Sequence, residues 1–288
     1  YSITIGTLTN TNYSISYVGA DFTITPKTLT ISGIRVSDKV YDGTDVATVN
    51  TSEINYDELA FSDTFTVGSS SGIFSDKNIG LSKTVTLTTT FMGAALGNYN
   101  IVHQPTATAS ITAKTVTATL TGSVSKVYNG TVSATLSDSN YLLGGFVSGE
   151  SATITQTFGT YDTKDIGSSK EVRVDLTNAY APVSGTLLSN YILPGTVSNT
   201  VGVISAQTLT ITAVNKSKVY DSAVYTPTDY LVGYDGFVNS ETKSVLSGTL
   251  TFTGTAITAT ASGTYVITPG GLSSSNYSIT YVSGVLSI

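Results

Sequence analysis

The feature that most constrains this chain is a repeat. An eight-residue segment, Ile24-Thr-Pro-Lys-Thr-Leu-Thr-Ile31, recurs in closely similar form at Ile111–Ala118 and Ile204–Ile211. The copies begin at positions 24, 111 and 204, so their spacings are 87 and 93 residues. A fixed period of this length is typical of an array of similar modules and argues against one large domain with a single core.

Two short motifs keep the same period. A Lys-Val-Tyr-(Asp/Asn) motif follows each junction, and its Asp-Gly and Asn-Gly forms favour tight turns. An Asn-Tyr pair begins an alternating run near the end of each repeat. The first motif comprises Lys39, Tyr41 and Asp42, then Lys126, Tyr128 and Asn129, then Lys218, Tyr220 and Asp221. The second comprises Asn98 and Tyr99, Asn190 and Tyr191, and Asn276 and Tyr277, with a further copy at Asn12 and Tyr13.

The spacing of these motifs predicts three complete β modules, at residues 28–114, 115–207 and 208–288. Residues 1–27 resemble the last part of the third module, so we expect them to be the C-terminal strands of a preceding module. Strands without their partners leave an open edge that can pair with another chain. The links between modules, such as Ala206-Gln207, are too short to act as flexible tethers.

The fold class follows from alternation within each repeat. Runs such as Val172–Leu176 and Leu209–Ile211 alternate apolar with polar residues, which is typical of strands with one buried face. The chain has 18 Tyr and 9 Phe for its cores. We predict an all-β chain of tandem small β-sandwich modules, immunoglobulin-like and placed end to end. The alternative is a mostly-β, grasp-like module with one short helix.

Composition argues against several classes of partner. The net charge is −6, and only 13 basic residues are present, so no nucleic acid is expected as a partner. No run approaches 18 apolar residues, so we expect no membrane insertion in this segment. The chain has no Cys, which rules out disulfides and thiolate metal sites.

The parts needed for catalysis are missing, and we predict that the chain is not an enzyme. The one His, His103, lies in a strand-like run, and no nucleophile-elbow motif accompanies it. Neighbouring acids such as Asp42 and Asp45, or Asp162 and Asp165, do not match the spacing of a known calcium loop. They are interpreted as solvated turn residues, with an irregular structural calcium site as the alternative. No other cofactor is expected.

The periodic tyrosines favour a structural role. A ring that recurs in every module is better explained by a buried ring with its hydroxyl bonded to the backbone than by a sugar-stacking platform. The loops that differ between modules are the better candidates for ligand contact. They provide Phe146, Glu150, Tyr234, Asp235 and Phe237.

Taken together, these segments resemble the YDG and MBG repeats of large bacterial surface and secreted adhesins, including filamentous-haemagglutinin-like proteins. Lys39–Thr44 and Lys126–Thr131, followed by Asp76–Gly80 and Lys164–Gly167, are YDG-like, whereas Gly263–Ile267, Asn276–Ile288 and residues 1–26 are MBG-like. The resemblance therefore implies that the module preceding residue 28 is MBG-like. Ser222 and Asn129 depart from the usual residues. The resemblance implies an extracellular location, on the bacterial cell surface or secreted, and a stalk or spacer that presents an adhesive domain. It implies neighbouring repeats as partners. Direct binding of a host or matrix glycan or protein by the modules is the alternative.

Overall fold

The chain is built almost entirely from β-strands. The computed structural model describes residues 1–60, 62–183 and 185–288, and these residues contain no α-helix. The all-β prediction of tandem small sandwiches is therefore confirmed, whereas the short helix of the grasp-like alternative does not form in the described residues. The helical elements described are 3-10 turns: η1 (Leu96–Asn98), η2 (Asp138–Asn140), η3 (Leu188–Asn190), η4 (Pro227–Asp229), η5 (Lys243–Val245) and η6 (Thr255–Thr258).

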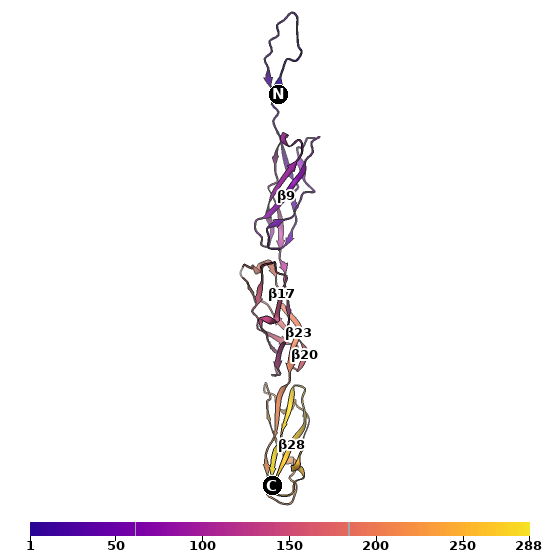
Figure 1. Cartoon of the computed structure of the whole chain (residues 1–288), viewed down its shortest axis with the longest axis vertical. Coiled ribbons are helices and arrows are strands. Elements are labelled where there is room, and N and C mark those ends of the chain that lie inside the picture. The colour runs from indigo at the N-terminus through magenta and orange to yellow at the C-terminus, as the bar shows by residue number, and fades with distance from the viewer. Residues whose placement is uncertain (61, 184) are drawn as a thin grey trace. The chain divides into compact units, whose positions relative to one another are not determined.

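Two compact units divide the chain. Unit 1 comprises residues 1–114 together with Ser189–Tyr191, and unit 2 comprises residues 115–188 and 192–288. Figure 1 labels β9 in unit 1 and β17, β20, β23 and β28 in unit 2.

Unit 1 contains a sandwich of two mixed sheets. Leu29 and Ile31 from one sheet and Val85 and Leu87 from the other are buried, and they alternate with exposed neighbours as expected for strands with one buried face. One sheet has the order β5 (Lys39–Val40), β12 (Thr106–Thr112), β10 (Gly80–Met92), β9 (Thr66–Phe74), β6 (Val46–Ala47). The other has the order β11 (Tyr99–Val102), β3 (Lys27–Ser32), β8 (Asn55–Asp57), and a small pair joins β4 (Arg35–Val36) to β7 (Val49–Asn50).

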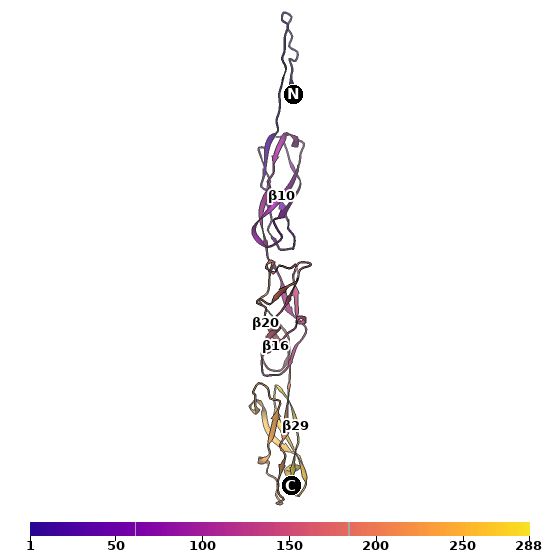
Figure 2. The same ribbon diagram turned by 90° about the vertical axis from the view of Figure 1, so that its left-hand side faces the viewer.

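The pairing is not purely antiparallel. β11 runs parallel to β3, and β12 runs parallel to β5, while β9, β10 and β12 pair antiparallel. Figure 2 shows β10 in unit 1. The parallel pair β3 and β11 matters for function because it places Tyr99, the first residue of β11, beside Lys27 at the start of β3.

Residues 1–27 bury almost nothing. Apart from half-buried Ile5, every residue in this segment is exposed, and before β3 begins at Lys27 its strand pairing is that of β1 (Ser2–Ile3) with β2 (Ala20–Asp21). Tyr1, Tyr13 and Val18 are among the most exposed apolar side chains of the chain. This exposure fits strands that lack a sheet to cover them, and their origin in a preceding module stays a prediction.

Unit 2 contains two sandwich bodies in succession, which we call the first body (residues 115–188 and 192–205) and the second body (residues 207–288). In the first body β20 and β23 lie side by side (Figure 1) and pair antiparallel. The main sheet has the order β15 (Val124–Val127), β23 (Thr196–Ser205), β20 (Gly167–Asp175), β19 (Phe158–Tyr161), β16 (Ser133–Thr135). Smaller pairs are β14 (Thr117–Leu120) with β17 (Tyr141–Gly144) and β18 (Ala152–Ile154) with β21 (Tyr180–Pro182).

The second body divides its strands differently but is also built from mixed sheets. A three-stranded and a four-stranded sheet again contain parallel pairs, β24 with β29 and β25 with β30. Only Ala206 separates β23 from β24, so one strand leads directly into the next body. The sheets are β26 (Val232–Asp235), β24 (Gln207–Ala213), β29 (Tyr277–Val282), and β25 (Lys216–Ser217), β30 (Gly284–Ser287), β28 (Thr264–Ser273), β27 (Ser247–Thr253). The remaining short strands of the chain are β13 (Lys114–Thr115) and β22 (Tyr191–Ile192).

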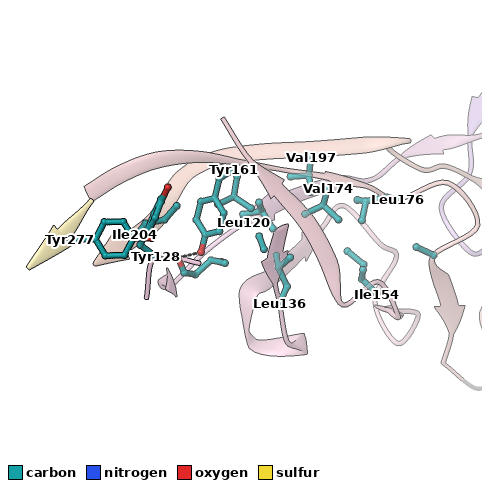
Figure 3. Packing of buried hydrophobic residues seen from close by; sticks show 14 of the residues in the cluster. Leu120, Tyr128, Leu136, Ile154, Tyr161, Val174, Leu176, Val197, Ile204 and Tyr277 are labelled. Carbon is teal, nitrogen blue, oxygen red and sulfur yellow. Dashed lines mark hydrogen bonds between the residues drawn. The ribbon is translucent and has the colours of Figure 1, made fainter. Parts of the chain in front are cut away.

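One buried cluster extends across the two bodies of unit 2. It runs from Leu176 in the first body to Leu209, Ile211 and Tyr277 in the second. Figure 3 shows Tyr277 next to Tyr128 at one end of this cluster, with Leu176 at the other. A separate cluster, which includes Ile267 and Leu286, fills the rest of the second body. The boundary between the bodies is therefore packed by apolar side chains rather than solvated.

Candidate functional site: a joint in unit 2

The Lys-Val-Tyr motif forms a turn that its own lysine holds together. Lys39 donates to Asp42 Oδ1 at 2.9 Å and to the carbonyl oxygens of Thr44 and Val46 at 2.8 and 2.9 Å. Gly43, with φ at 82°, occupies the left-handed region that favours glycine. Burial pushes the pKa of Asp42 up, but the hydrogen bonds from Lys39 and Thr44 outweigh it and leave that pKa below its ordinary value. We call this element the Lys-Val-Tyr turn.

In the second Lys-Val-Tyr turn the lysine again donates hydrogen bonds to oxygen atoms of its own turn. Lys126 donates to Asn129 Oδ1 at 2.9 Å, to the Thr131 carbonyl at 2.6 Å and to the Ser133 carbonyl at 2.9 Å. Asn129 can replace an aspartate because the turn needs only an oxygen acceptor at that position. Burial lowers the pKa of Lys126.

The third turn departs further from the pattern. Lys218 forms an ion pair with Asp221 at 2.6 Å and donates to the Ala223 carbonyl at 2.6 Å. Ser222 stands where the other turns have glycine, and its φ of 62° is an uncommon conformation for a side chain other than glycine. The turn therefore forms without glycine, at the cost of local backbone strain.

In unit 2 the tyrosine of one turn meets the Asn-Tyr pair of the next body. Tyr128 is 1% exposed, and its ring lies 5.5 Å from that of Tyr277 in an edge-to-face arrangement. Both hydroxyls donate to one carboxylate: Tyr128 to Glu241 Oε1 at 2.8 Å and Tyr277 to Glu241 Oε2 at 2.7 Å. The Tyr277 hydroxyl also accepts the backbone N–H of Val238 at 3.1 Å. Glu241 thus holds two aromatic rings that come from different bodies.

Lys164 supplies the charge that this carboxylate needs. Its ammonium lies 2.8 Å from Glu241 Oε1 and 5.9 Å from the centre of the Tyr128 ring. The Glu241 side chain is only 9% exposed, so without a cation its ionised form would be costly. Burial pushes the pKa of Glu241 up, but hydrogen bonds from Lys164, Tyr277 and Tyr128 outweigh it and bring it below its ordinary 4.5. Burial is also the main cause that raises the pKa of Tyr277 to about 12.

Asn276 makes a second contact across the same boundary. Its Oδ1 accepts the backbone N–H of Ile166 at 3.0 Å, and its Nδ2 donates to Asp165 Oδ1 at 2.8 Å. The loop that carries Asp165 and Ile166 is held by Lys170, whose ammonium lies 3.0 Å from Asp162. The side-chain amide of Asn276 is therefore hydrogen-bonded to both a backbone and a side-chain group of the first body.

Asn239 and Gly130 fit tightly at this boundary. Asn239 Nδ2 donates to the Gly130 carbonyl at 3.1 Å. A Cβ atom added at Gly130 would lie 2.6 Å from Asn239 Cβ, closer than real Cβ contacts allow, and φ of Gly130 is 75°. We call this set of contacts the joint, which comprises Tyr128, Gly130 and Lys164–Ile166 from the first body and Asn239, Glu241, Asn276 and Tyr277 from the second.

Unit 1 contains a partial match to the joint, within its own residues. The ring of Tyr41 lies 5.4 Å from that of Tyr191, again edge to face. Asn190, fully buried, accepts the Ile79 N–H at 3.1 Å and donates to Asn78 Oδ1 at 3.0 Å. The paired tyrosines and the asparagine that binds an Ile N–H therefore occur twice in the chain.

The candidate ligand loops divide between two environments. Phe146 and Glu150 line a pocket of about 430 Å³ in the first body, together with Asp138, Tyr141 and Leu143. Phe237, by contrast, packs against Tyr234 at 5.6 Å and against Tyr277 at 5.5 Å, next to the joint. Asp235 is exposed in β26. The structure thus brings Phe146 and Glu150 together but places Phe237 in structural packing.

Sequence analysis did not assign Glu241 or Lys164 to a site, although a signal for each was present. Glu241 ends the segment Gly-Phe-Val-Asn-Ser-Glu at 236–241, which matches Gly-Phe-Val-Ser-Gly-Glu at 145–150. Lys164 opens Lys-Asp-Ile-Gly, which matches Lys-Asn-Ile-Gly at 77–80. The two loops share an acid at the same position, and in the second body this acid, Glu241, makes the contact with the first body.

The acids that sequence analysis singled out bind other side chains, and the histidine lies near a phenylalanine ring. Asp42 and Asp162 pair with lysines, and Asp165 binds Asn276. His103 is exposed, and its ring lies 5.6 Å from that of Phe91. Across residues 1–60, 62–183 and 185–288, no group of three or more His, Asp or Glu side chains could hold a metal ion. In the same part of the chain, no helix has the length and apolar character needed to cross a membrane.

Comparison with known families identifies the modules. The family model of the YDG domain matches residues 25–109 and 112–200, which together exceed half of the chain. The chain belongs to the YDG domain family. Its last part, residues 209–287, matches the MBG domain of the YGX type. The resemblance to YDG and MBG repeats is thereby confirmed.

Other comparisons add little to this YDG–MBG chain. No curated relative matches its sequence. Among solved structures it is similar to Drosophila N-cadherin EC1-3, with 10% identity, a TM-score of 0.20, and coverage of 88% of this chain and 97% of that one. YDG and MBG domains are typical of bacterial surface repeat proteins and are not enzyme families.

Proposed function

We propose that the YDG–MBG chain is a spacer in an extracellular bacterial adhesin, in which successive modules are fixed to one another and hold an adhesive domain away from the cell. The joint in unit 2 is the observation that carries this proposal. A tether needs only a flexible link, whereas this boundary has a charged network, an aromatic pair and one residue of linker.

The magnitudes favour a stiff boundary. Hydrogen bonds to charged groups contribute about 1.5 to 3 kcal/mol each, and an edge-to-face aromatic pair adds about 1 kcal/mol. Glu241 alone receives three such bonds, from Tyr128, Lys164 and Tyr277. Bending the two bodies apart would break the two bonds that come from the first body, those of Tyr128 and Lys164, and would expose the Tyr128 ring.

Spin labelling tests the stiffness directly. The chain has no Cys, so Thr135→Cys in the first body and Ser262→Cys in the second, both exposed positions, would be labelled selectively. We expect one narrow distance distribution by pulsed electron resonance, and a broad one after Glu241→Ala is added. A broad distribution without that substitution would contradict a spacer with fixed modules.

A second candidate function is direct binding of a glycan or protein, and the pocket in the first body favours it. Aromatic rings of Tyr141 and Phe146 and carboxylates of Asp138 and Glu150 line this pocket, a combination that can stack on and hydrogen-bond to a sugar. A glycan and matrix-protein screen tests this function. Binding that is lost with Phe146→Ala but retained with Phe158→Ala, an exposed ring elsewhere on the first body, would support it.

A further inference from the structure

The start of the first YDG repeat carries the receiving half of the joint. Tyr99 donates its hydroxyl to Asp63 Oδ2 at 2.6 Å and accepts the Ala60 N–H at 3.0 Å. In the second body, Tyr277 donates to Glu241 and accepts the Val238 N–H in the same way. In both places the acid lies three residues after the N–H donor.

The supporting contacts agree as well. Asp63 donates its backbone N–H to the Ala60 carbonyl at 3.0 Å, and Glu241 does the same to Val238 at 3.0 Å. A phenylalanine ring, Phe65, lies 5.5 Å from the Tyr99 ring at 82°, and Phe237 has the same distance and angle to Tyr277. The two tyrosine–acid pairs therefore share the same hydrogen bonds and the same edge-to-face contact with a phenylalanine ring.

The two tyrosine–acid pairs differ in the hydrogen bonds that they and the neighbouring asparagine receive from another body. Glu241 also receives Tyr128 and Lys164, and the side chain of Asn276 binds Ile166 and Asp165. Within the described residues of unit 1, no hydrogen bond reaches Asp63 Oδ1 or the side chain of Asn98, which is exposed.

We propose that Asp63, Asn98 and Tyr99 form a docking surface for the Lys-Val-Tyr end of another YDG repeat. The occupant needs three groups: a tyrosine ring to meet Tyr99, a lysine to pair with Asp63, and a backbone N–H to bind the amide of Asn98. These are the groups that Tyr128, Lys164 and Ile166 supply in unit 2. The proposal rests on continuity with an occupied joint and does not depend on the spacer role.

The proposed occupant is the end of another YDG repeat, and not the end of an MBG module such as the one that residues 1–27 resemble. The MBG repeat has Lys218 and Tyr220, but its sequence contains no Lys-(Asp/Asn)-Ile-Gly segment, so it lacks the second lysine and the matching Ile N–H. YDG repeats have both, at 77–80 and 164–167. A carboxylate on the surface and a lysine on the occupant are also complementary in charge.

An extended chain tests this docking surface. Residues 1–24 would be replaced by a second copy of residues 115–204, joined at the shared junction so that Ile204 of the copy takes the place of Ile24. Asp165→Cys in the copy and Asn98→Cys would then be treated with a short bismaleimide. The 288-residue chain with Asp165→Cys and Asn276→Cys is the positive control, because those side chains touch at 2.8 Å. Asp138→Cys in the copy, at an exposed site, replaces Asp165→Cys in the negative control.

We expect cross-linking within about threefold of the positive control, since both pairs would share a similar effective concentration. Adding Asp63→Ala to the extended chain should slow it about tenfold, in line with the loss of one charged hydrogen bond. Cross-linking no faster than the negative control, while the positive control reacts, would overturn the docking surface. That result would leave the spin-label test of the spacer unaffected, so the two proposals fail separately.

Discussion

Tyr128 and Tyr220 occupy the same place in the same motif, yet one is 1% and the other 60% exposed. Their lysines behave alike, because Lys126 and Lys218 both donate to oxygens of their own turns. The comparison separates two roles within one motif. The lysine makes the turn, which is a local feature, whereas the tyrosine is buried where a second ring packs against it, as Tyr277 does against Tyr128 and Tyr191 does against Tyr41.

The largest effect is expected when the buried ring of Tyr128 is removed. Tyr128→Ala should lower the free energy of opening of the joint by about 3 to 5 kcal/mol, the usual range for removing a large buried ring. Tyr220→Ala should cost only about 0.5 kcal/mol, as for other surface positions. Hydrogen exchange of the amides in β15 and β29 measures the difference, and equal effects of the two substitutions would contradict it.

The carboxylate comes next in magnitude. Glu241→Gln keeps the shape but removes the charge that faces Lys164 and two tyrosine hydroxyls, and we expect a loss of about 2 kcal/mol. The matched control is Glu53→Gln, which breaks an exposed pair with Arg35 and should cost under about 0.5 kcal/mol. Urea titrations of both variants measure the free energy of unfolding. A Glu241→Gln chain as stable as the Glu53→Gln control would show that the carboxylate does not stabilise the joint.

Acid should open the joint through the same group. The pKa of Glu241 is below its ordinary 4.5, so its contribution is fully present above that value and is lost as the pH falls through the lower, folded-state pKa. Each unit of pKa difference corresponds to about 1.4 kcal/mol. Spin-label distances across the joint should broaden below pH 4.5. Glu241→Gln should be insensitive to pH in this window, and an unchanged pH response in that variant would assign the effect to other acids.

The smallest expected effect concerns the turn alone. Ser222→Gly relieves the positive φ of 62° in the third Lys-Val-Tyr turn and should stabilise the second body by about 0.5 kcal/mol. The exposure of Tyr220 should not change, because the turn and the joint are separate features. Calorimetry measures the gain, and a loss of stability would show that Ser222 has a role beyond the backbone conformation.

Much of the fold could be predicted from the sequence because its signals are local. Alternation identified strands such as β20 and β24, and the recurrence of the Lys-Val-Tyr and Asn-Tyr motifs indicated modules. Buried periodic tyrosines were also expected, and Tyr41 and Tyr128 are 1% exposed. The hydroxyl of Tyr128, however, binds a carboxylate rather than the expected backbone group.

The joint itself could not be predicted because its partners are far apart in sequence. Tyr128 and Glu241 are separated by 113 residues, and no local pattern links them. Phe237 was predicted to contact a ligand because its loop differs between modules, yet its ring packs against Tyr277. Recurrence indicates that a residue matters, but only tertiary packing shows whether it serves its own module or the next one.

Small-angle X-ray scattering of the 288-residue chain in dilute buffer tests the central claim, that joined modules act as a spacer. A chain of this length folded into a single compact body would have a radius of gyration of about 19 Å. Modules joined end to end, each about 35 to 40 Å long, should give a value near 35 Å. A value near 35 Å is the result that the spacer account predicts, and one near 19 Å would contradict it.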